Sequence, residues 1–233
     1  MQTTANTVEI VSFDLWKTLI TSNPTPNRAS RAKDLFAMFR PDMSFVDFAT
    51  VVADAETHAD KLSESTEQHY GPKERTSFVA QRVGATMLSD DDFTAFYNQQ
   101  SERFMQFPPH LMQPDIPEVL GALRGSGRKV ALISNTGFVN GREMRRALEL
   151  TGITSSLVDY AVFSDEVGVN KPNKRIFEQL IDASQTVPQH ILHIGDNYTA
   201  DYEGATAAGM QAIHLKPEDT IAGALSYLLQ GGK

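Results

Sequence analysis

The sequence lacks cysteine altogether and contains a single tryptophan among its 233 residues. The missing cysteine excludes disulfide scaffolds, cysteine zinc sites, iron–sulfur clusters and thiol nucleophiles, and it is consistent with a reducing cytoplasm. No apolar stretch approaches the roughly 18 residues that cross a bilayer. Residues 1–9 carry neither the basic residues nor the apolar segment of a secretion signal. We therefore expect a cytoplasmic protein without a membrane partner.

Positive charge is also scarce, because 21 Lys and Arg residues face 29 Asp and Glu residues, which gives a formal net charge of -8. The sequence has no long basic run, so it disfavours nucleic acid as a partner. Hydrophobic residues make up 41% of the chain and charged residues 21%. This composition is typical of a globular protein with an apolar core, and it excludes intrinsic disorder.

Five short, apolar and mostly β-branched runs predict buried strands. They are Val8–Phe13, Val130–Ser134, Tyr160–Phe163, Ile191–Ile194 and Gln211–Leu215. Helical patterns alternate with the later runs, at about Ile116–Leu123, Gly141–Leu150, Asn173–Ser184, Thr199–Ala208 and Thr220–Leu229. Because this alternation is typical of β-α-β units, the sequence predicts an α/β fold with a parallel sheet.

Residues 22–107 interrupt this alternation and show no strand signal. Apolar residues at helical spacing predict four helices there, and Ser44 and Ser89 are candidate helix caps. Proline-rich segments flank the region at residues 23–26 and 107–109. We predict a small α-helical cap domain over residues 22–107, hinged on a core domain of residues 1–21 and 108–233.

Polar side chains stand where the predicted strands end. Parallel sheets bind ligands at the carboxyl ends of their strands, so these side chains are expected to converge on one crevice. Each one alone is equally well explained as a helix cap. In chain order they are Asp14, then Ser134 and Asn135, then Lys171, and finally Asp196 with Asp201 five residues later.

The segments around these residues resemble the four motifs of the haloacid dehalogenase-like (HAD) hydrolase superfamily. The matching segments are Phe13–Leu19, Ile133–Asn135, Gly168–Pro172, and Ile194–Asn197 continuing through Asp201 to Ala205. The resemblance implies a hydrolase with a Rossmann-like core of parallel strands. The helical insert between the first and second motifs is similar to that of the helical-cap subclass.

The resemblance also implies a catalytic centre with a metal ion. Asp14 is then the nucleophile that attacks phosphorus and forms an aspartyl-phosphate. Asp14, Asp196, Asp201 and the backbone carbonyl of Trp16 are the implied ligands of Mg²⁺. Charge counting supports the metal, because three carboxylates against one Lys leave about -2 at a site that must admit a phosphate dianion.

The phosphoryl group is implied to be held by residues of the second and third motifs. Ser134 and the backbone amide of Asn135 bind its oxygens, and Lys171 offsets the charge that develops during transfer. Together with Asp14, Ser134 and Lys171 form the predicted catalytic set. The predicted substrate contacts are Ser134, Asn135, Lys171 and Trp16. The implied partner is a small phosphorylated molecule, and the protein is expected to be a monomer or a homodimer.

The first motif departs from the family pattern at two positions. HAD phosphatases carry Asp two residues after the nucleophile, where it protonates the leaving group, and this chain has Trp16 there. An indole cannot exchange that proton at neutral pH. The glycine that usually follows is replaced by Lys17.

Three functions therefore stay open at this point. The first is a Mg²⁺-dependent phosphohydrolase whose substrate has a good leaving group. The second is a 2-haloacid dehalogenase, because those enzymes also carry an aromatic residue at the position of Trp16, although they have a neutral residue at that of Asp196. The third is a catalytically impaired member that binds a phosphorylated ligand or a protein. Retention of Asp196 favours the first.

Overall fold

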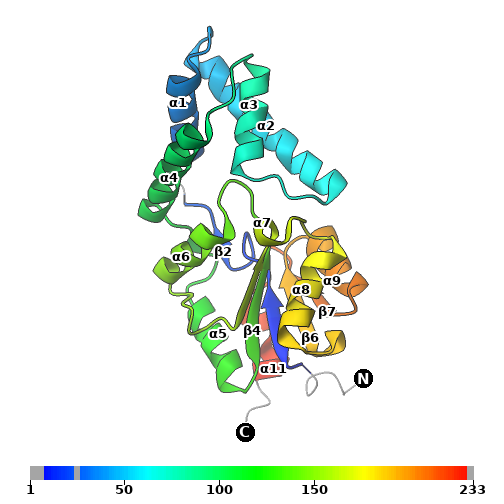
Figure 1. Cartoon of the computed structure of the whole chain (residues 1–233). Coiled ribbons are helices and arrows are strands. Elements are labelled where there is room, and N and C mark those ends of the chain that lie inside the picture. Colours follow the sequence, from blue (N-terminus) through cyan, green and yellow to red (C-terminus); the bar gives the residue numbers. More distant parts are fainter. Residues whose placement is uncertain (1–7, 24–26, 230–233) are drawn as a thin grey trace.

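The computed structural model of the chain describes residues 8–23 and 27–229. Its centre is a five-stranded parallel sheet in the order β5-β4-β1-β6-β7, which confirms the predicted α/β fold (Figure 1). Phe13 lies opposite Leu132 on one neighbouring strand and Ile194 on the other, so the three central strands end within two residues of one another at the same edge of the sheet. The strands are β1 (Ile10–Phe13), β4 (Lys129–Ser134), β5 (Tyr160–Phe163), β6 (Ile191–Gly195) and β7 (Gln211–His214).

Apolar side chains cover both faces of the sheet because residues along each strand alternate between the faces. Val11 and Phe13 pack against α5 (Ile116–Gly125), α6 (Gly141–Thr151), α10 (Ile221–Ala224) and α11 (Ser226–Leu229). Ile10 packs on the other face against α8 (Lys174–Ser184) and α9 (Gly204–Ala207). The described residues include no helix that is long and apolar enough to cross a membrane.

Four helices form a separate layer beyond the carboxyl ends of the strands (Figure 1). Their own apolar cluster includes Leu35, Phe48, Val79 and Phe96. The predicted caps are confirmed, since Ser44 Oγ accepts from the Asp47 amide at 3.2 Å and Ser89 Oγ accepts from the Asp92 amide at 3.1 Å. We call this layer the α1–α4 bundle. It consists of α1 (Asn27–Phe39), α2 (Phe45–Thr66), α3 (Pro72–Arg82) and α4 (Asp90–Gln106).

A two-stranded antiparallel sheet that the sequence pattern did not predict joins the bundle to the rest of the chain. It pairs β2 (Ile20–Thr21) with β3 (His110–Leu111), where the chain leaves for the bundle and returns from it. Strands of two residues are too short to show a hydrophobic period. The predicted proline-rich joint at Pro24–Pro26 lies outside the described residues.

Two predicted helices differ from the structure. The first half of Thr199–Ala208 is a π-helical turn, η2 (Tyr198–Glu203), and only the second half is α-helical. Thr220–Leu229 is divided into α10 and α11 at Leu225. Hydrophobic spacing alone does not separate an α-helix from a π-turn, because the turn is decided by local hydrogen bonds. Here the Asn197 side chain accepts from the Ala200 amide at 2.9 Å.

Candidate active site

Asp14 follows β1 directly, at the carboxyl edge of the sheet, and its amide donates to the Ile194 carbonyl at 2.9 Å. A tight turn comes next, in which the amides of Leu19 and Ile20 both donate to the carbonyl of Leu15. This turn holds Trp16, which is partly buried against the core cluster, two residues beyond Asp14.

Lys17 adopts a left-handed backbone conformation in this turn, with φ of 61°. A side chain in that region is strained by roughly 1–2 kcal/mol, whereas glycine adopts it freely. We expect Lys17→Gly to be more stable than Lys17→Ala by about 1 kcal/mol, because both variants remove the ammonium and only glycine relieves the strain. Urea denaturation of the two variants measures this difference. Equal stabilities would mean that the turn is unstrained.

The Lys171 ammonium joins the third motif to the first and fourth. Its Nζ donates to Asp14 Oδ1 and to Asp201 Oδ1, both at 2.6 Å, and to the Ile133 carbonyl at 2.8 Å. All three charged side chains are buried. A buried charge is tolerated only when it is paired and hydrogen-bonded, and the three bonds of Lys171 meet that condition.

Burial and neighbouring charges shift the pKa values of both Asp14 and Lys171. Burial raises the pKa of Asp14 to about 7; Lys171 opposes the shift, and the charges of Asp201 and Asp196 add to it. Burial also opposes the charge on Lys171, but Asp14 and Asp201 outweigh it and raise the pKa of Lys171 above its usual value. Lys171 therefore does not fully compensate for the burial of Asp14 and for the charges of Asp201 and Asp196.

Asp201 is the most firmly held carboxylate of the cluster. Its Oδ2 accepts from the Asn197 amide at 3.0 Å, and its Oδ1 accepts from Lys171 and from His193 Nε2 at 3.3 Å. Burial opposes its ionisation, but Lys171 and the His193 bond outweigh burial and hold the pKa of Asp201 well below its usual range. A side chain at Gly195 would overlap the Asp201 carboxyl group, so this approach requires glycine.

His193 orients Asp201 from beneath the site. It is fully buried, and burial lowers its pKa, so the ring is neutral at pH 7. An ionised carboxylate only accepts hydrogen bonds, so Nε2 carries the proton and Nδ1 accepts from Ser12 Oγ at 3.0 Å. The sequence analysis assigned no role to either His193 or Ser12. The available signal was the pair of polar residues at the same depth of two apolar strands.

Asp196 completes an acidic triad. The triad consists of Asp14, Asp196 and Asp201. Each offers one carboxylate oxygen, and these three oxygens lie within 4.8 Å of one another. Asp196 is partly buried, and burial, with a further contribution from Asp201, raises its pKa. Its backbone carbonyl lies 3.0 Å from His214 Nε2 of β7. Hard carboxylate oxygens at this spacing are the donor set that suits Mg²⁺.

Ser134 and Asn135 lie at the end of β4, beside β1, and Ser134 is buried. The Asn135 side chain is occupied by the third motif, since its Oδ1 accepts from the Lys171 amide at 2.7 Å and its Nδ2 donates to the Lys171 carbonyl at 3.1 Å. The Asn135 side chain thus fixes the backbone of Lys171, and the backbone amide of Asn135 stays the predicted contact to a substrate.

Three basic residues of the bundle form ion pairs with acidic residues of the same bundle. Lys73 pairs with Asp90 at 2.6 Å and Arg75 pairs with Asp60 at 2.7 Å. Arg31 pairs with Glu56. The charges of these three basic residues are therefore balanced within the bundle.

Comparisons with known proteins find similar sequences and similar folds. The model of the haloacid dehalogenase-like hydrolase family matches residues 8–209. The HAD phosphatase of Thermococcus onnurineus has a TM-score of 0.69 at 20% identity, over 97% of this chain and 99% of its own. The magnesium-bound HAD hydrolase YfnB of Bacillus subtilis has a TM-score of 0.63 at 17% identity, over 92% and 91%. At these identities the two structures support the fold alone.

Relatives of known activity match shorter stretches. The glyceraldehyde 3-phosphate phosphatase of Methanothermobacter thermautotrophicus is 35% identical over 47% of this chain and 46% of its own. The pyrimidine 5′-nucleotidase YjjG of Escherichia coli is 37% identical over 44% of each chain. (S)-2-haloacid dehalogenase 1 of a Pseudomonas species is 29% identical over 46% of each. These matches thus span a little under half of the relatives' length.

Proposed function

The chain belongs to the haloacid dehalogenase-like hydrolase family, and on that premise we propose that it is a Mg²⁺-dependent phosphohydrolase acting on a small phosphorylated metabolite. The observation that carries the proposal is the acidic triad of Asp14, Asp196 and Asp201 around Lys171, at the carboxyl edge of the sheet. Two relatives with phosphatase or nucleotidase names support phosphorus as the reacting centre.

Asp14 is the proposed nucleophile. Its carboxylate attacks phosphorus, the bond to the leaving oxygen breaks, and water then hydrolyses the resulting aspartyl-phosphate. Splitting the reaction in this way replaces one difficult displacement by two easier ones. Lys171 holds Asp14 in place through its 2.6 Å bond and offsets the charge that gathers on the phosphoryl oxygens.

The other groups bind and orient the phosphoryl group or its cofactor. The Ser134 hydroxyl and the Asn135 amide donate to phosphoryl oxygens. Asp14, Asp196, Asp201 and the carbonyl of Trp16 are the proposed ligands of Mg²⁺. When bound, this ion supplies Lewis-acid polarisation and brings the site to neutrality for an incoming phosphate.

We also propose that the α1–α4 bundle acts as a cap over this site, with the core formed by residues 1–21 and 108–233 and the cap by residues 22–107. All of the proposed site residues come from a single chain, so the site is complete in a monomer and in each subunit of a homodimer. A reducing cytoplasm is the proposed compartment, because the sequence contains no cysteine.

Trp16 stands where an acid is expected, and this sets the substrate class. General acid catalysis contributes typically 10²- to 10⁴-fold, and the benefit is greatest for an alkoxide, which must be protonated as it departs. Aryl phosphates, acyl phosphates and phosphoanhydrides have leaving oxygens that hold negative charge well. We therefore propose that the natural substrate is an aryl phosphate, an acyl phosphate or a phosphoanhydride.

A leaving-group series tests this proposal. We expect kcat/KM to fall steeply as the leaving-group pKa rises across aryl and alkyl phosphates, and Trp16→Asp to raise the rate on alkyl phosphates. A folded variant is required, because loss of a buried Trp can cost about 3–5 kcal/mol, so thermal unfolding is measured alongside. A flat profile for the wild type would show that another group or a water supplies the proton.

One observation favours a second candidate, a 2-haloacid dehalogenase. Displacement of halide from carbon needs no acid, which agrees with Trp16, and a dehalogenase is among the relatives. Release of chloride from (S)-2-chloropropionate in the presence of EDTA would support this candidate. Asp196 is a proposed metal ligand, and displacement of halide from carbon does not need a metal. Its presence therefore favours the phosphohydrolase.

A further inference from the structure

The loop that follows Ser134 enters the α1–α4 bundle. Phe138 of this loop packs against the apolar cluster of the bundle. Its ring lies edge-on to Phe96, with centroids 6.0 Å apart, and 6.2 Å from the ring of Tyr97. The guanidinium carbon of Arg31 lies 3.6 Å from the ring centroid. Phe138, only four positions beyond Ser134, is therefore partly buried against the apolar cluster of the bundle.

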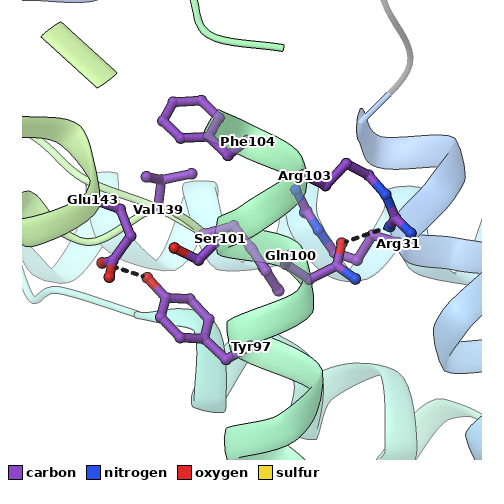
Figure 2. Close-up of a pocket in the computed structure, with 9 residues that line it drawn as sticks. Arg31, Tyr97, Gln100, Ser101, Arg103, Phe104, Val139 and Glu143 are labelled. Atoms are coloured by element: carbon purple, nitrogen blue, oxygen red, sulfur yellow. Dashed lines mark hydrogen bonds between the residues drawn. The ribbon is translucent and has the colours of Figure 1, made fainter. Parts of the chain in front are cut away.

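Contacts on both sides of Phe138 hold the same loop. The Tyr97 hydroxyl of α4 accepts from the Asn140 amide at 3.1 Å. It also donates to Glu143 Oε2 at 3.0 Å (Figure 2). Arg75 of α3 lies against Gly137, where an added Cβ would stand 3.4 Å from the guanidinium carbon. The bundle thus contacts the loop at three successive points.

The bundle also contacts the neighbouring segments of the core. His69 Nδ1 lies 3.1 Å from the hydroxyl of Ser164, in α7 (Ser164–Val167), and that hydroxyl accepts from the Thr136 amide at 2.8 Å. The Asn170 amide donates to the Glu67 carbonyl at 2.8 Å, immediately before Lys171. The segments that carry Ser134 and Lys171 are therefore both tied to the bundle.

We propose that Phe138 is a positioning residue, through which the bundle sets the placement of the Ser134–Asn140 loop and hence of the groups that hold the phosphoryl oxygens. The inference rests on the proposed function for its catalytic consequence. Its structural part, that the loop is ordered by the bundle through Phe138, stands on the contacts alone. A misplacement of about 1 Å in such a loop can lower a rate about 100-fold.

Phe138→Ala and a matched control, Phe36→Ala, test the proposal. Phe36 is a half-buried residue of the same apolar cluster, and its ring contacts Phe45 and Phe48, both within the bundle. With p-nitrophenyl phosphate and Mg²⁺, we expect Phe138→Ala to lose about 10- to 100-fold in kcat with a smaller change in KM. Phe36→Ala should stay within about twofold of the wild type, and Phe138→Leu should recover most of the loss.

Hydrogen exchange supplies a readout that does not depend on turnover. We expect the amides of residues 135–140 to exchange faster in Phe138→Ala and at the wild-type rate in Phe36→Ala. Equal losses of activity in the two alanine variants, or unchanged exchange in the loop, would overturn the inference. If the wild type does not hydrolyse the phosphate ester, the proposed function fails, and the exchange rates still decide whether Phe138 orders the loop.

Discussion

Asp14→Asn is expected to lower turnover of p-nitrophenyl phosphate by about 10³-fold or more, equivalent to about 4 kcal/mol of barrier. A neutral amide is a poor nucleophile and cannot form the aspartyl-phosphate. The fold should persist, because an amide oxygen at this position can still accept the Lys171 hydrogen bond, which is 2.6 Å long in the native protein. Steady-state kinetics and circular dichroism check the two halves of this expectation.

Asp182→Asn is the matched control for this substitution. Asp182 lies on the exposed side of α8, and the same loss of charge there should leave the rate within about twofold of the wild type. More than a few per cent of wild-type turnover in Asp14→Asn would show that another group attacks the substrate.

Removal of divalent metal is expected to have the second-largest effect, a loss of essentially all phosphatase activity in EDTA that Mg²⁺ restores. The reason is the charge balance of the site, where one buried Lys171 stands against Asp14, Asp196 and Asp201. A phosphate dianion is repelled by the remaining negative charge unless a cation balances it. The measurement is the initial rate against Mg²⁺ concentration after treatment with EDTA.

Asp196→Asn makes the metal experiment specific to the site. It weakens one proposed ligand at a partly buried position, so we expect half-maximal activity to need a higher Mg²⁺ concentration. Sodium chloride at matched ionic strength should restore nothing. Undiminished phosphatase turnover in EDTA would exclude a role for the metal in the reaction.

The sequence was sufficient to predict the sheet and the polar edge where its strands end. The short apolar run Val130–Ser134, for example, is buried along its whole length, as its composition predicts for a central strand covered on both faces. Parallel strands place their carboxyl ends together, so the sequence predicted that Asp14, Lys171 and Asp201 converge without giving the order of the strands. Element ends were less certain, as the π-helical turn at Tyr198–Glu203 shows, because a few local hydrogen bonds decide them.

Contacts between residues far apart in the chain were decided only by the tertiary structure. The Ser12–His193 bond joins residues 181 positions apart, and the Asn135 side chain bonds the Lys171 backbone across 36 positions. Each of these residues has an ordinary local explanation, as a packed or capping residue, so no local pattern marks it. Their function depends on which strand or loop packs beside them.

Phe138 shows the difference most clearly. From sequence, it is one aromatic residue in a loop after a strand, and such a loop is normally expected at the surface. In the structure it is partly buried against the apolar cluster of the α1–α4 bundle, beneath Arg31, a residue 107 positions earlier in the chain. Local sequence determined where strands and helices form, because neighbouring residues govern backbone conformation and side-chain periodicity. The docking of one layer on another determined which side chains meet, because apolar area is buried only when the layers come together.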